Sequence, residues 1–378
     1  MEGEREVKLI SQEDDTVNVQ RYSRGENRDD MRKMKLWKYF SWWIHSFKAG
    51  HITSVTMAKW IGTNKHVYEI APNVTLEDVD GNYRLLQGIL DQFGASHRRQ
   101  TCIDFRGQFM APLKYAQEEG FIDRFPQSRL VLHSVEDSWT FEKKSKVKNQ
   151  AKSLSEAEFR MFKTRLQIEL TDLLKQKPII SATHSGLKIV HPENHAISKQ
   201  TRLMVLYTLF NTGCRFAEVL GITLTDLGTN EIAINKTWDY KSPENRFAPT
   251  KNLSSIRKVS VRPEFIAFLK NYLSWKVKYF DSDGDLPILV EPKTMIYNDT
   301  FNHFFRSYQK KYGIDKSLSI HKIRHSYISF MLAQKEISTE WIARQVGHSN
   351  TLMIRKVYGH LLDERAARDE ISAMSAMM

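Results

Sequence analysis

The chain is organised around residues 319–362, which read SIHKIRHSYISFMLAQKEISTEWIARQVGHSNTLMIRKVYGHLL. His321 and Arg324 stand three positions apart, His348 follows a glycine, and Tyr358 comes ten positions after His348. An arginine, two imidazoles and a phenol suit the binding of a phosphodiester and its attack by the phenol oxygen. The rest of the chain should then supply a second arginine, a proton donor for the leaving oxygen and a surface that binds DNA.

The composition indicates a folded, basic protein. At 378 residues the chain is long enough for two domains, and its 41% hydrophobic and 11% aromatic content excludes a disordered chain. The net charge of +12 favours a polyanionic partner, with nucleic acid first and an anionic membrane surface second. Charge alone leaves open a basic protein with no such partner.

Cysteine usage and hydropathy indicate the compartment. Cys102 and Cys214 cannot form a disulfide framework and no Cys-x-x-Cys occurs, as expected in a reducing cytoplasm. No apolar run reaches the length of a membrane span, and the start MEGEREVK lacks the layout of a signal peptide. We therefore expect a cytoplasmic protein with no membrane partner.

Residues 1–33 are polar, with acidic and basic side chains nearly balanced. This composition predicts an N-terminal extension of unknown role, which is either a tail or a short segment docked on the next domain. A small DNA-contacting module is the alternative, although the segment is short and not clearly basic.

Residues 34–138 have the pattern of a helical module. Apolar residues recur at helical spacing in four segments, which are 36–50, 54–61, 83–94 and 96–120. Ser96 is the expected N-cap of the fourth helix, and Pro112 is expected to kink or divide it. Short connections between four helices predict a small bundle.

Basic side chains of this module are candidate DNA contacts. The sequence SHRRQ places three of them at a helix start, where backbone N–H groups also favour phosphate. The candidates are Lys59, His97, Arg98 and Arg99. The alternative is an ordinary solvated surface.

A lysine-rich linker is predicted at residues 139–153. Residues 141–152 contain five lysines, one acid and no apolar helical stripe, which marks a domain boundary. The candidate phosphate contacts there are Lys143, Lys144, Lys146 and Lys148. Such lysines either contact DNA phosphates or simply keep the linker solvated.

Residues 154–378 are predicted to form a mixed α/β domain. Core-facing helices are expected at 154–174 and 203–210, followed by a turn at Gly213. Arg215 and Glu218 then share one side of the next helix, where a carboxylate can hold a guanidinium for phosphate binding. The alternative for this pair is a surface salt bridge.

Two short apolar alternations predict a small antiparallel β-sheet. They contain Ile232 with Ile234 and Val259 with Val261, and the turn between them carries Lys251. Pro263 opens a further helix at its first position. The chain is therefore predicted to be mainly α, with a small antiparallel sheet in its second domain.

Two sequences resemble metal sites but fail in detail. DSDGD at 281–285 resembles a calcium loop, but its glycine is misplaced and Pro292 stands where the last ligand belongs. HKIRH at 321–325 has the histidine spacing of a zinc helix, but Lys322 replaces the glutamate and Arg324 would repel a cation. No metal site is expected.

Taken together, the motifs resemble those of the tyrosine recombinases, specifically the phage-integrase branch. They occur in the family's order between Arg215 and Tyr358, and they read TGCRFAE, PTKN, HKIRHS, VGHS and VYGH. The resemblance covers about residues 35–365 and implies a helical core-type DNA-binding domain followed by a mixed α/β catalytic domain.

The resemblance implies a role for each matching residue. Arg215 and Arg324 would donate to nonbridging oxygens of the scissile phosphate. His321 and His348 would add hydrogen bonds there, and His321 would help to take the proton from the tyrosine. Tyr358 would be the nucleophile that forms a 3′-phosphotyrosyl link.

It further implies that Lys251 is the general acid for the leaving 5′-oxygen and that Glu218 orients Arg215. His325 is expected to pack or hydrogen-bond near the site. One phosphodiester replaces another, so neither ATP, a metal nor any other cofactor is needed.

The implied function is site-specific DNA recombination, such as integration and excision of a viral genome or mobile element in a bacterial host cytoplasm. The implied partners are double-stranded DNA with attachment-type sites, a homotetramer that passes through a Holliday junction, a DNA-bending host factor and an excisionase. The residues after Tyr358 either pack on a neighbouring protomer or fray. The alternatives are a type IB topoisomerase-like enzyme that relaxes DNA and a catalytically silent DNA-binding regulator.

Overall fold

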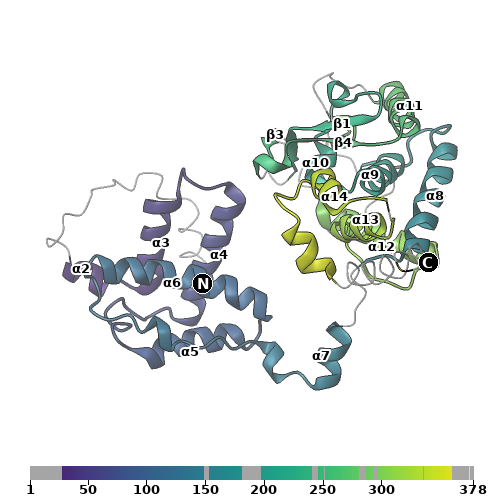
Figure 1. Cartoon of the computed structure of the whole chain (residues 1–378). Coiled ribbons are helices and arrows are strands. Elements are labelled where there is room, and N and C mark those ends of the chain that lie inside the picture. The colour runs from purple at the N-terminus through teal and green to yellow at the C-terminus, as the bar shows by residue number, and fades with distance from the viewer. Residues whose placement is uncertain are drawn as a thin grey trace. The chain divides into compact units, whose positions relative to one another are not determined.

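The computed structural model describes residues 28–148, 153–180, 197–240, 246–250, 252–280, 287–292, 294, 296–334, 336–359 and 374. The chain divides into two compact units, residues 1–149 and 150–378, which are described separately (Figure 1). The predicted class is confirmed, because the described chain is mainly helical with short antiparallel strands. No helix in the described part is long and apolar enough to cross a membrane.

The regular elements described in the first unit are all helices. Its elements are α2 (Arg28–Lys33), α3 (Leu36–Lys48), α4 (Ser54–Ile70), α5 (Tyr83–Gly94), α6 (Arg99–Glu118), the short 3-10 helices η1 (Gln127–Arg129) and η2 (Val135–Ser138), and α7 (Phe141–Lys148). Apolar side chains from α3, α5 and α6 make one core, in which Phe40, Leu86 and Phe109 are almost completely buried.

Two local predictions for this unit were wrong, and a third was wrong in part. The second helix continues to Ile70 instead of ending at residue 61. Helix α6 starts at Arg99 rather than after Ser96, because the His97 ring stacks on Phe93 with centroids 3.9 Å apart and holds this segment as a turn. Pro112 does not divide α6; it is buried, and its carbonyl accepts a hydrogen bond of 3.0 Å from the Tyr39 hydroxyl.

The end of the N-terminal extension packs on the first unit. Met31 of α2 is 2% exposed, and Arg32 donates to the Phe121 carbonyl at 3.1 Å and pairs with Asp80 at 3.2 Å. Residues 1–27 lie outside the described part of the chain.

The predicted linker contains a helix. Residues 141–148 form α7 without an apolar stripe, because lysine and glutamate favour helix even on an exposed segment. The boundary between the units, between residues 149 and 150, falls inside the segment 139–153.

The described part of the second unit mixes helices with four short strands. Its elements are α8 (Glu156–Leu173), α9 (Lys199–Thr212), α10 (Phe216–Leu220), η3 (Leu224–Asp226), β1 (Glu231–Ile234), β2 (Lys236–Asp239), β3 (Arg246–Pro249), η4 (Leu253–Ser255), β4 (Arg257–Ser260), α11 (Pro263–Tyr279), α12 (Asn298–Lys311), α13 (His321–Leu332) and α14 (Thr339–Val346). Residues 352–359 are also helical.

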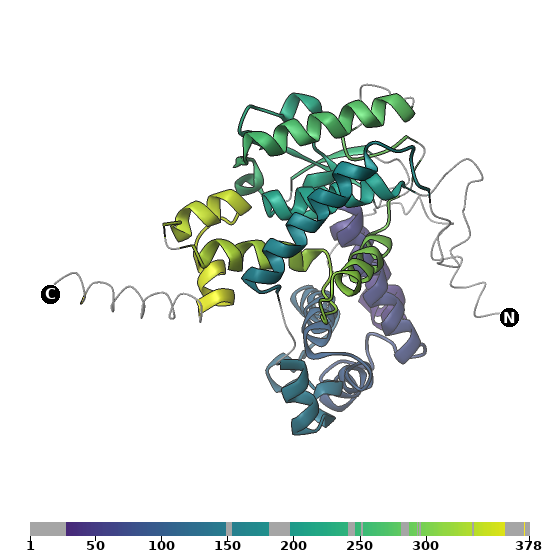
Figure 2. The ribbon, with the colours of Figure 1, turned by 90° about the vertical axis from the view of Figure 1, so that its right-hand side faces the viewer.

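The strands form two separate pairs. The predicted antiparallel pairing is confirmed, with Ile232 opposite Val259 in β1 and β4. A second pair, β2 with β3, was not predicted, because KTWD and RFAP lack an apolar alternation. Figures 1 and 2 show α11 at the outer edge of this unit.

Helix α9 is the centre of the second unit. Nearly every residue from Gln200 to Thr212 is buried, and α8, α10, α12 and α13 pack around it. A helix that is buried on all sides has a fixed position, so its C-terminal end at Gly213 is a firm support for the residues that follow.

Candidate active site

The first arginine of the site stands just after the end of α9. Gly213 caps that helix with φ of 64°, and a Cβ there would lie 2.4 Å from Cδ1 of Tyr327, so both the backbone and the packing require glycine. The chain reverses at this cap and places Arg215 as the N-cap residue of α10.

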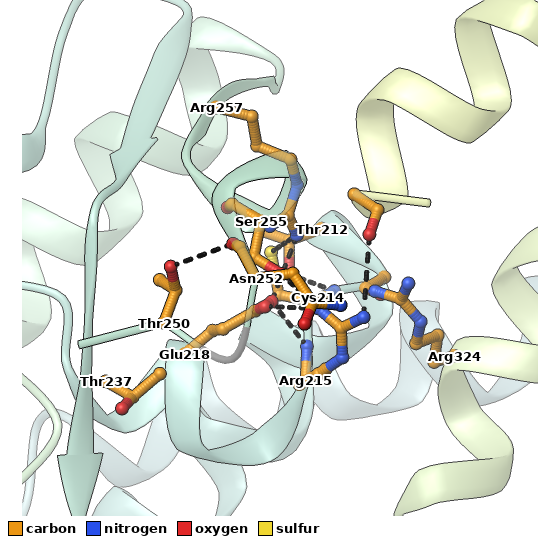
Figure 3. Close-up of polar contacts among 12 residues, drawn as sticks. Thr212, Cys214, Arg215, Glu218, Thr237, Thr250, Asn252, Ser255, Arg257 and Arg324 are labelled. Carbon is orange, nitrogen blue, oxygen red and sulfur yellow. Dashed lines mark hydrogen bonds and ion pairs between the residues drawn. The ribbon is translucent and has the colours of Figure 1, made fainter. Parts of the chain in front are cut away.

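Arg215 is held on three sides. Its Nη1 donates to Oε1 of Glu218 at 2.7 Å and to Oγ of Ser255 at 3.1 Å. Its Nη2 donates to the carbonyl of Gly347 at 3.5 Å. Glu218 also accepts the backbone N–H of Arg215 at 2.9 Å, so the carboxylate fixes both the main chain and the guanidinium (Figure 3).

Arg257 of β4 also contacts the Glu218 carboxylate, and sequence reasoning missed it. Its side chain is 7% exposed, and its Nη2 lies 3.0 Å from Oε2 of Glu218 and 3.2 Å from Sγ of Cys214. Its Nε donates to the Gln345 carbonyl at 2.8 Å. In the sequence RKVSVR it is an ordinary basic strand residue, and no signal pointed to these distant partners.

Glu218 therefore lies between two guanidinium groups. Burial acts to raise the pKa of its carboxyl group, but Arg257 and Arg215 outweigh burial and hold that pKa below its usual value. The carboxylate stays charged and keeps both arginines in place.

Gly347 allows the end of α14 to approach Arg257 closely. It caps α14 with φ of 72°, and a Cβ at this position would lie 2.9 Å from Nη1 of Arg257. This contact and the bond from Arg215 to the Gly347 carbonyl determine where His348, the next residue, is placed.

The second arginine of the site forms no ion pair with a described carboxylate. Arg324 on α13 is 5% exposed, and its Nη1 donates to the Gly213 carbonyl at 3.1 Å. Its Nη2 is buried and has no hydrogen-bond partner among the described residues. Burial and the charge of Arg215 lower the pKa of Arg324 to about 10. Figure 3 shows the two guanidinium groups side by side.

Two histidines of the predicted set lie in the same cationic environment. Burial and the neighbouring arginines lower the pKa of His348 to about 4, and its Nδ1 is buried with no partner among the described residues. Burial and nearby cations, Arg324 first, also lower the pKa of His321. Both imidazoles are neutral at pH 7, so the positive charge of the site comes from its arginines.

Tyr358 is buried and contacts His325. Its side chain is 5% exposed, and its hydroxyl oxygen lies 2.6 Å from Nδ1 of His325. Burial raises the pKa of Tyr358, although the charge of Arg324 acts in the opposite direction. The spacing of four residues between His321 and His325 places both on one face of α13, which was the available signal for this contact.

This arrangement has the properties of an anion site beside a buried phenol hydroxyl. Arg324 and His348 both present buried nitrogens without partners, and a buried unpaired donor is rare unless a ligand completes it. A phosphate oxygen is a suitable ligand, because a guanidinium matches its geometry.

The sequence of this region matches a known family. Residues 185–365 match the family model described as Phage integrase family. This region, just under half of the chain, is therefore similar to the phage integrase family. The match contains Arg215, His321, Arg324, His348 and Tyr358.

A curated relative is the integrase of Staphylococcus phage L54a. It is 28% identical over 165 residues, which are 40% of this chain and 46% of that protein. The chain thus spans less than half the length of the curated relative it matches.

Solved structures share the fold of this chain. An integrase of the transposon Tn1549 in complex with transposon right end DNA has a TM-score of 0.62 and 17% identity, covering 90% of this chain and 100% of that one. A lambda integrase tetramer bound to a Holliday junction has a TM-score of 0.54 and 12% identity, covering 92% of this chain and 86% of that one. At these identities the likeness shows the tyrosine recombinase fold.

Lys251, the family's expected general acid, lies outside the described residues. Its neighbours Thr250 and Asn252 are described, and the Thr250 hydroxyl donates to the Asn252 carbonyl at 3.2 Å. The residues after 359, except Met374, also lie outside the described part, and so does the C-terminal tail predicted to contact another protomer.

The candidate DNA contacts belong to the first unit and have varied surroundings. Lys59, Lys144 and Lys146 are exposed, whereas the His97 ring is stacked on Phe93. Arg98 and Lys143 both lie over the ring of Trp139, at 5.5 and 4.5 Å, and Arg99 approaches Asp137 at 4.0 Å. The side chain of Lys148 lies outside the described part.

Metal-binding groups do not gather in the described part of the chain. No set of three or more His, Cys, Asp or Glu side chains there could hold a metal ion. The rings of His321 and His325 are 5.3 Å apart on α13, and residues 281–286 of the calcium-like sequence lie outside the described residues.

Proposed function

We propose that this protein is a site-specific tyrosine recombinase that cleaves and rejoins DNA through a 3′-phosphotyrosyl intermediate. One observation carries the proposal: the buried Tyr358 hydroxyl belongs to the same site as a buried Arg324 nitrogen that has no partner among the described residues. A nucleophile and an unfilled phosphate donor in one site support phosphodiester transesterification.

The proposed cleavage step uses the residues of the second unit. Arg215 and Arg324 bind nonbridging oxygens of the scissile phosphate, and His321 and His348 donate further hydrogen bonds. Tyr358 attacks phosphorus as the bond to the 5′-oxygen breaks. The two positive charges stabilise the extra negative charge of the transition state, which is the largest contribution expected of such a site.

Lys251 is proposed to protonate the leaving 5′-oxygen. The phosphotyrosyl bond retains the energy of the original phosphodiester, so rejoining by another 5′-hydroxyl needs neither ATP nor a metal. Glu218 is proposed as the residue that orients Arg215, supported by the two hydrogen bonds between them.

The partners follow from the same proposal. The first unit is proposed to bind DNA through the basic side chains named above, and the second to cut it. A lambda integrase dimer has been solved on a core site and a lambda integrase tetramer on a Holliday junction, which supports a homotetramer acting on double-stranded attachment-type sites. We propose integration and excision of a phage or mobile element in a bacterial cytoplasm, with a DNA-bending host factor and an excisionase as accessory partners.

A nicked suicide DNA substrate tests the central proposal. The protein is incubated with fragments from its own genomic neighbourhood, in EDTA and without ATP, and covalent protein–DNA adducts are separated on denaturing gels. Wild type should form an adduct on one specific site, and Tyr358→Phe should form none. Tyr297→Phe is the matched control, because Tyr297 is 45% exposed and stands at the start of α12.

The other outcomes separate the alternatives. Adducts on every sequence, together with relaxation of supercoiled plasmid, would indicate a topoisomerase-like enzyme. Specific DNA binding without any adduct would indicate a regulator and would overturn the proposed chemistry.

A further inference from the structure

The hydroxyl of Tyr358 is directed at one residue. Among the described residues it takes part in two hydrogen bonds, and both are to His325. The oxygen lies 2.6 Å from the imidazole Nδ1 and 3.5 Å from the His325 carbonyl oxygen. The first distance is short for a hydrogen bond and the second is at the limit of one, so the imidazole is the main partner.

The surroundings of His325 determine which partner donates the proton. Burial is the main cause that lowers the pKa of His325 to about 4, and the titratable groups that face it add to the effect. These groups are Lys322, His321 and Arg324 on α13 and His348 after α14, while the tyrosine itself comes from residues 352–359. The imidazole is therefore neutral at pH 7 and offers a lone pair on one nitrogen.

The phenol has a single proton to donate. In the tautomer that carries its proton on Nε2, Nδ1 of His325 accepts from the Tyr358 hydroxyl, and it is closer than the carbonyl by 0.9 Å, the difference between 3.5 and 2.6 Å. Tyr358 is 5% exposed, which leaves little room for water to compete for that proton.

We propose that His325 takes the proton from Tyr358 during cleavage, as the general base of the reaction; this rests on the proposed recombinase function. The bond from Oη of Tyr358 to phosphorus forms while the bond from phosphorus to the 5′-oxygen breaks. The Oη proton moves to Nδ1 of His325, and a proton from Lys251 moves to the leaving 5′-oxygen. On rejoining, both protons return.

His321 fits this task less well, although the family resemblance assigned it a share of the proton transfer. Its ring centroid lies 5.3 Å from that of His325, and it makes no hydrogen bond to Tyr358 among the described residues. A base needs hydrogen-bond contact with the proton that it removes, and His325 has that contact.

Substrate binding makes His325 a better base at the right moment. Without DNA, nearby cations disfavour the imidazolium form. A scissile phosphate bound to Arg324 brings a negative charge that opposes these cations and favours the protonated form. The proton therefore moves when the phosphate is in place, which protects the tyrosine from premature ionisation.

Two substitutions separate proton transfer from simple positioning. In His325→Asn the amide oxygen still accepts a hydrogen bond but cannot take a proton, whereas His325→Ala removes both functions. Single-turnover cleavage of the suicide substrate is measured from pH 4 to 9, a range that extends to the pKa of about 4 that His325 has without DNA. A lost general base lowers a rate by roughly 10²–10⁴-fold, so both variants should cleave at least about 100-fold more slowly than wild type.

The pH profile and a rescue experiment give readouts that a structural role would not change. The wild-type rate should fall at low pH as His325 becomes protonated, and this fall should be absent in His325→Asn. A fluorinated tyrosine at position 358 has a more acidic phenol, so it should restore much of the His325→Asn rate. His303→Asn, an exposed histidine on α12, is the matched control.

Three results would overturn the proposal: a His325→Asn rate within about threefold of wild type, an unchanged low-pH fall in that variant, or no rescue by the acidic tyrosine. Each result is interpreted under conditions in which the wild-type protein forms the adduct and the Tyr358→Phe variant does not. Failure of the recombinase function itself would instead appear as no wild-type adduct. DNA affinity and thermal unfolding of the variants show whether they are folded.

Discussion

The two arginines of the site differ in how completely the fold supports them. Arg215 has a buried carboxylate, a serine hydroxyl and a backbone carbonyl as partners. Arg324 has one carbonyl and no ion pair among the described residues, and one of its nitrogens lacks any partner there. Arg215 therefore has its hydrogen-bond partners before DNA binds. The unpaired nitrogen of Arg324 gains a partner only when a ligand binds.

This difference separates two ways in which a fold prepares a site. A satisfied network such as Arg215 with Glu218 and Arg257 holds its donors rigidly, which reduces the reorganisation needed in the reaction. A buried and uncompensated charge such as Arg324 costs folding stability, and a bound anion recovers that cost. The largest gain on binding a phosphate is therefore expected at Arg324.

Replacing each arginine in turn by methionine is the strongest test of this difference between Arg215 and Arg324. Arg324→Met should reduce single-turnover cleavage by about 10³-fold or more, since a buried charged donor to the transition state is lost. Its free energy of unfolding without DNA should rise by about 1–4 kcal/mol, because a buried charge with no counterion is replaced by an apolar side chain.

Arg215→Met should also abolish most cleavage but should lower the free energy of unfolding, because Glu218 then loses a partner. Urea unfolding of both variants tests the opposite signs. Equal destabilisation by both substitutions would show that Arg324 is as well supported as Arg215.

Among the residues that hold Arg215, Glu218→Gln should be the most destabilising change. Removing the charge from a carboxylate between two guanidiniums should cost about 3–5 kcal/mol of unfolding free energy. Because the pKa of Glu218 is lowered in the folded chain, its contribution is present above the unfolded value near 4.3 and is lost as the pH falls below it. The free energy of unfolding should therefore change less with acid pH in Glu218→Gln than in wild type. The same pH dependence in both proteins would contradict the role of this carboxylate.

Mild acid should lower stability through the two histidines near Arg324, which are His325 and His348. The pKa values of His325 and His348 are about 4 in the folded chain, against about 6.5 when unfolded. Their contribution to stability is therefore present above about pH 6.5 and is lost as the pH falls toward 4. Thermal unfolding between pH 7 and 5 should show this loss, and Arg324→Met should reduce it because a repelling charge is gone. An equal loss of stability in wild type and in Arg324→Met would show that the charge of Arg324 does not contribute to it.

Ser255→Ala should have the smallest effect. It removes one of the two partners of Nη1 of Arg215 while Glu218 remains, so a change of about 1 kcal/mol, or roughly fivefold in cleavage rate, is expected. A loss as large as that of Arg324→Met would mean that Ser255 has a role in the reaction beyond holding Arg215.

Local patterns were sufficient for much of the second unit. The strand pair Ile232 with Val259 followed from alternation, and the turn at Gly213 followed from glycine at a helix end. Errors in the first unit came from tertiary contacts, as at Pro112, where packing in the core retains a residue that usually breaks helices. Strands β2 and β3 were missed because they have no apolar alternation.

The sequence by itself determined which residue types are present and in which order, from Arg215 to Tyr358, because motif spacing and glycine positions are local properties. Only the tertiary structure decided which of these groups touch. Arg257 meets Glu218 and Gln345 across 39 and 88 positions, and no local pattern records such contacts. His321 and His325 share one face of α13, and the approach of residues 352–359 decides that His325 receives the tyrosine. Contacts between distant segments depend on how whole helices pack, which is why they appear only in the folded chain.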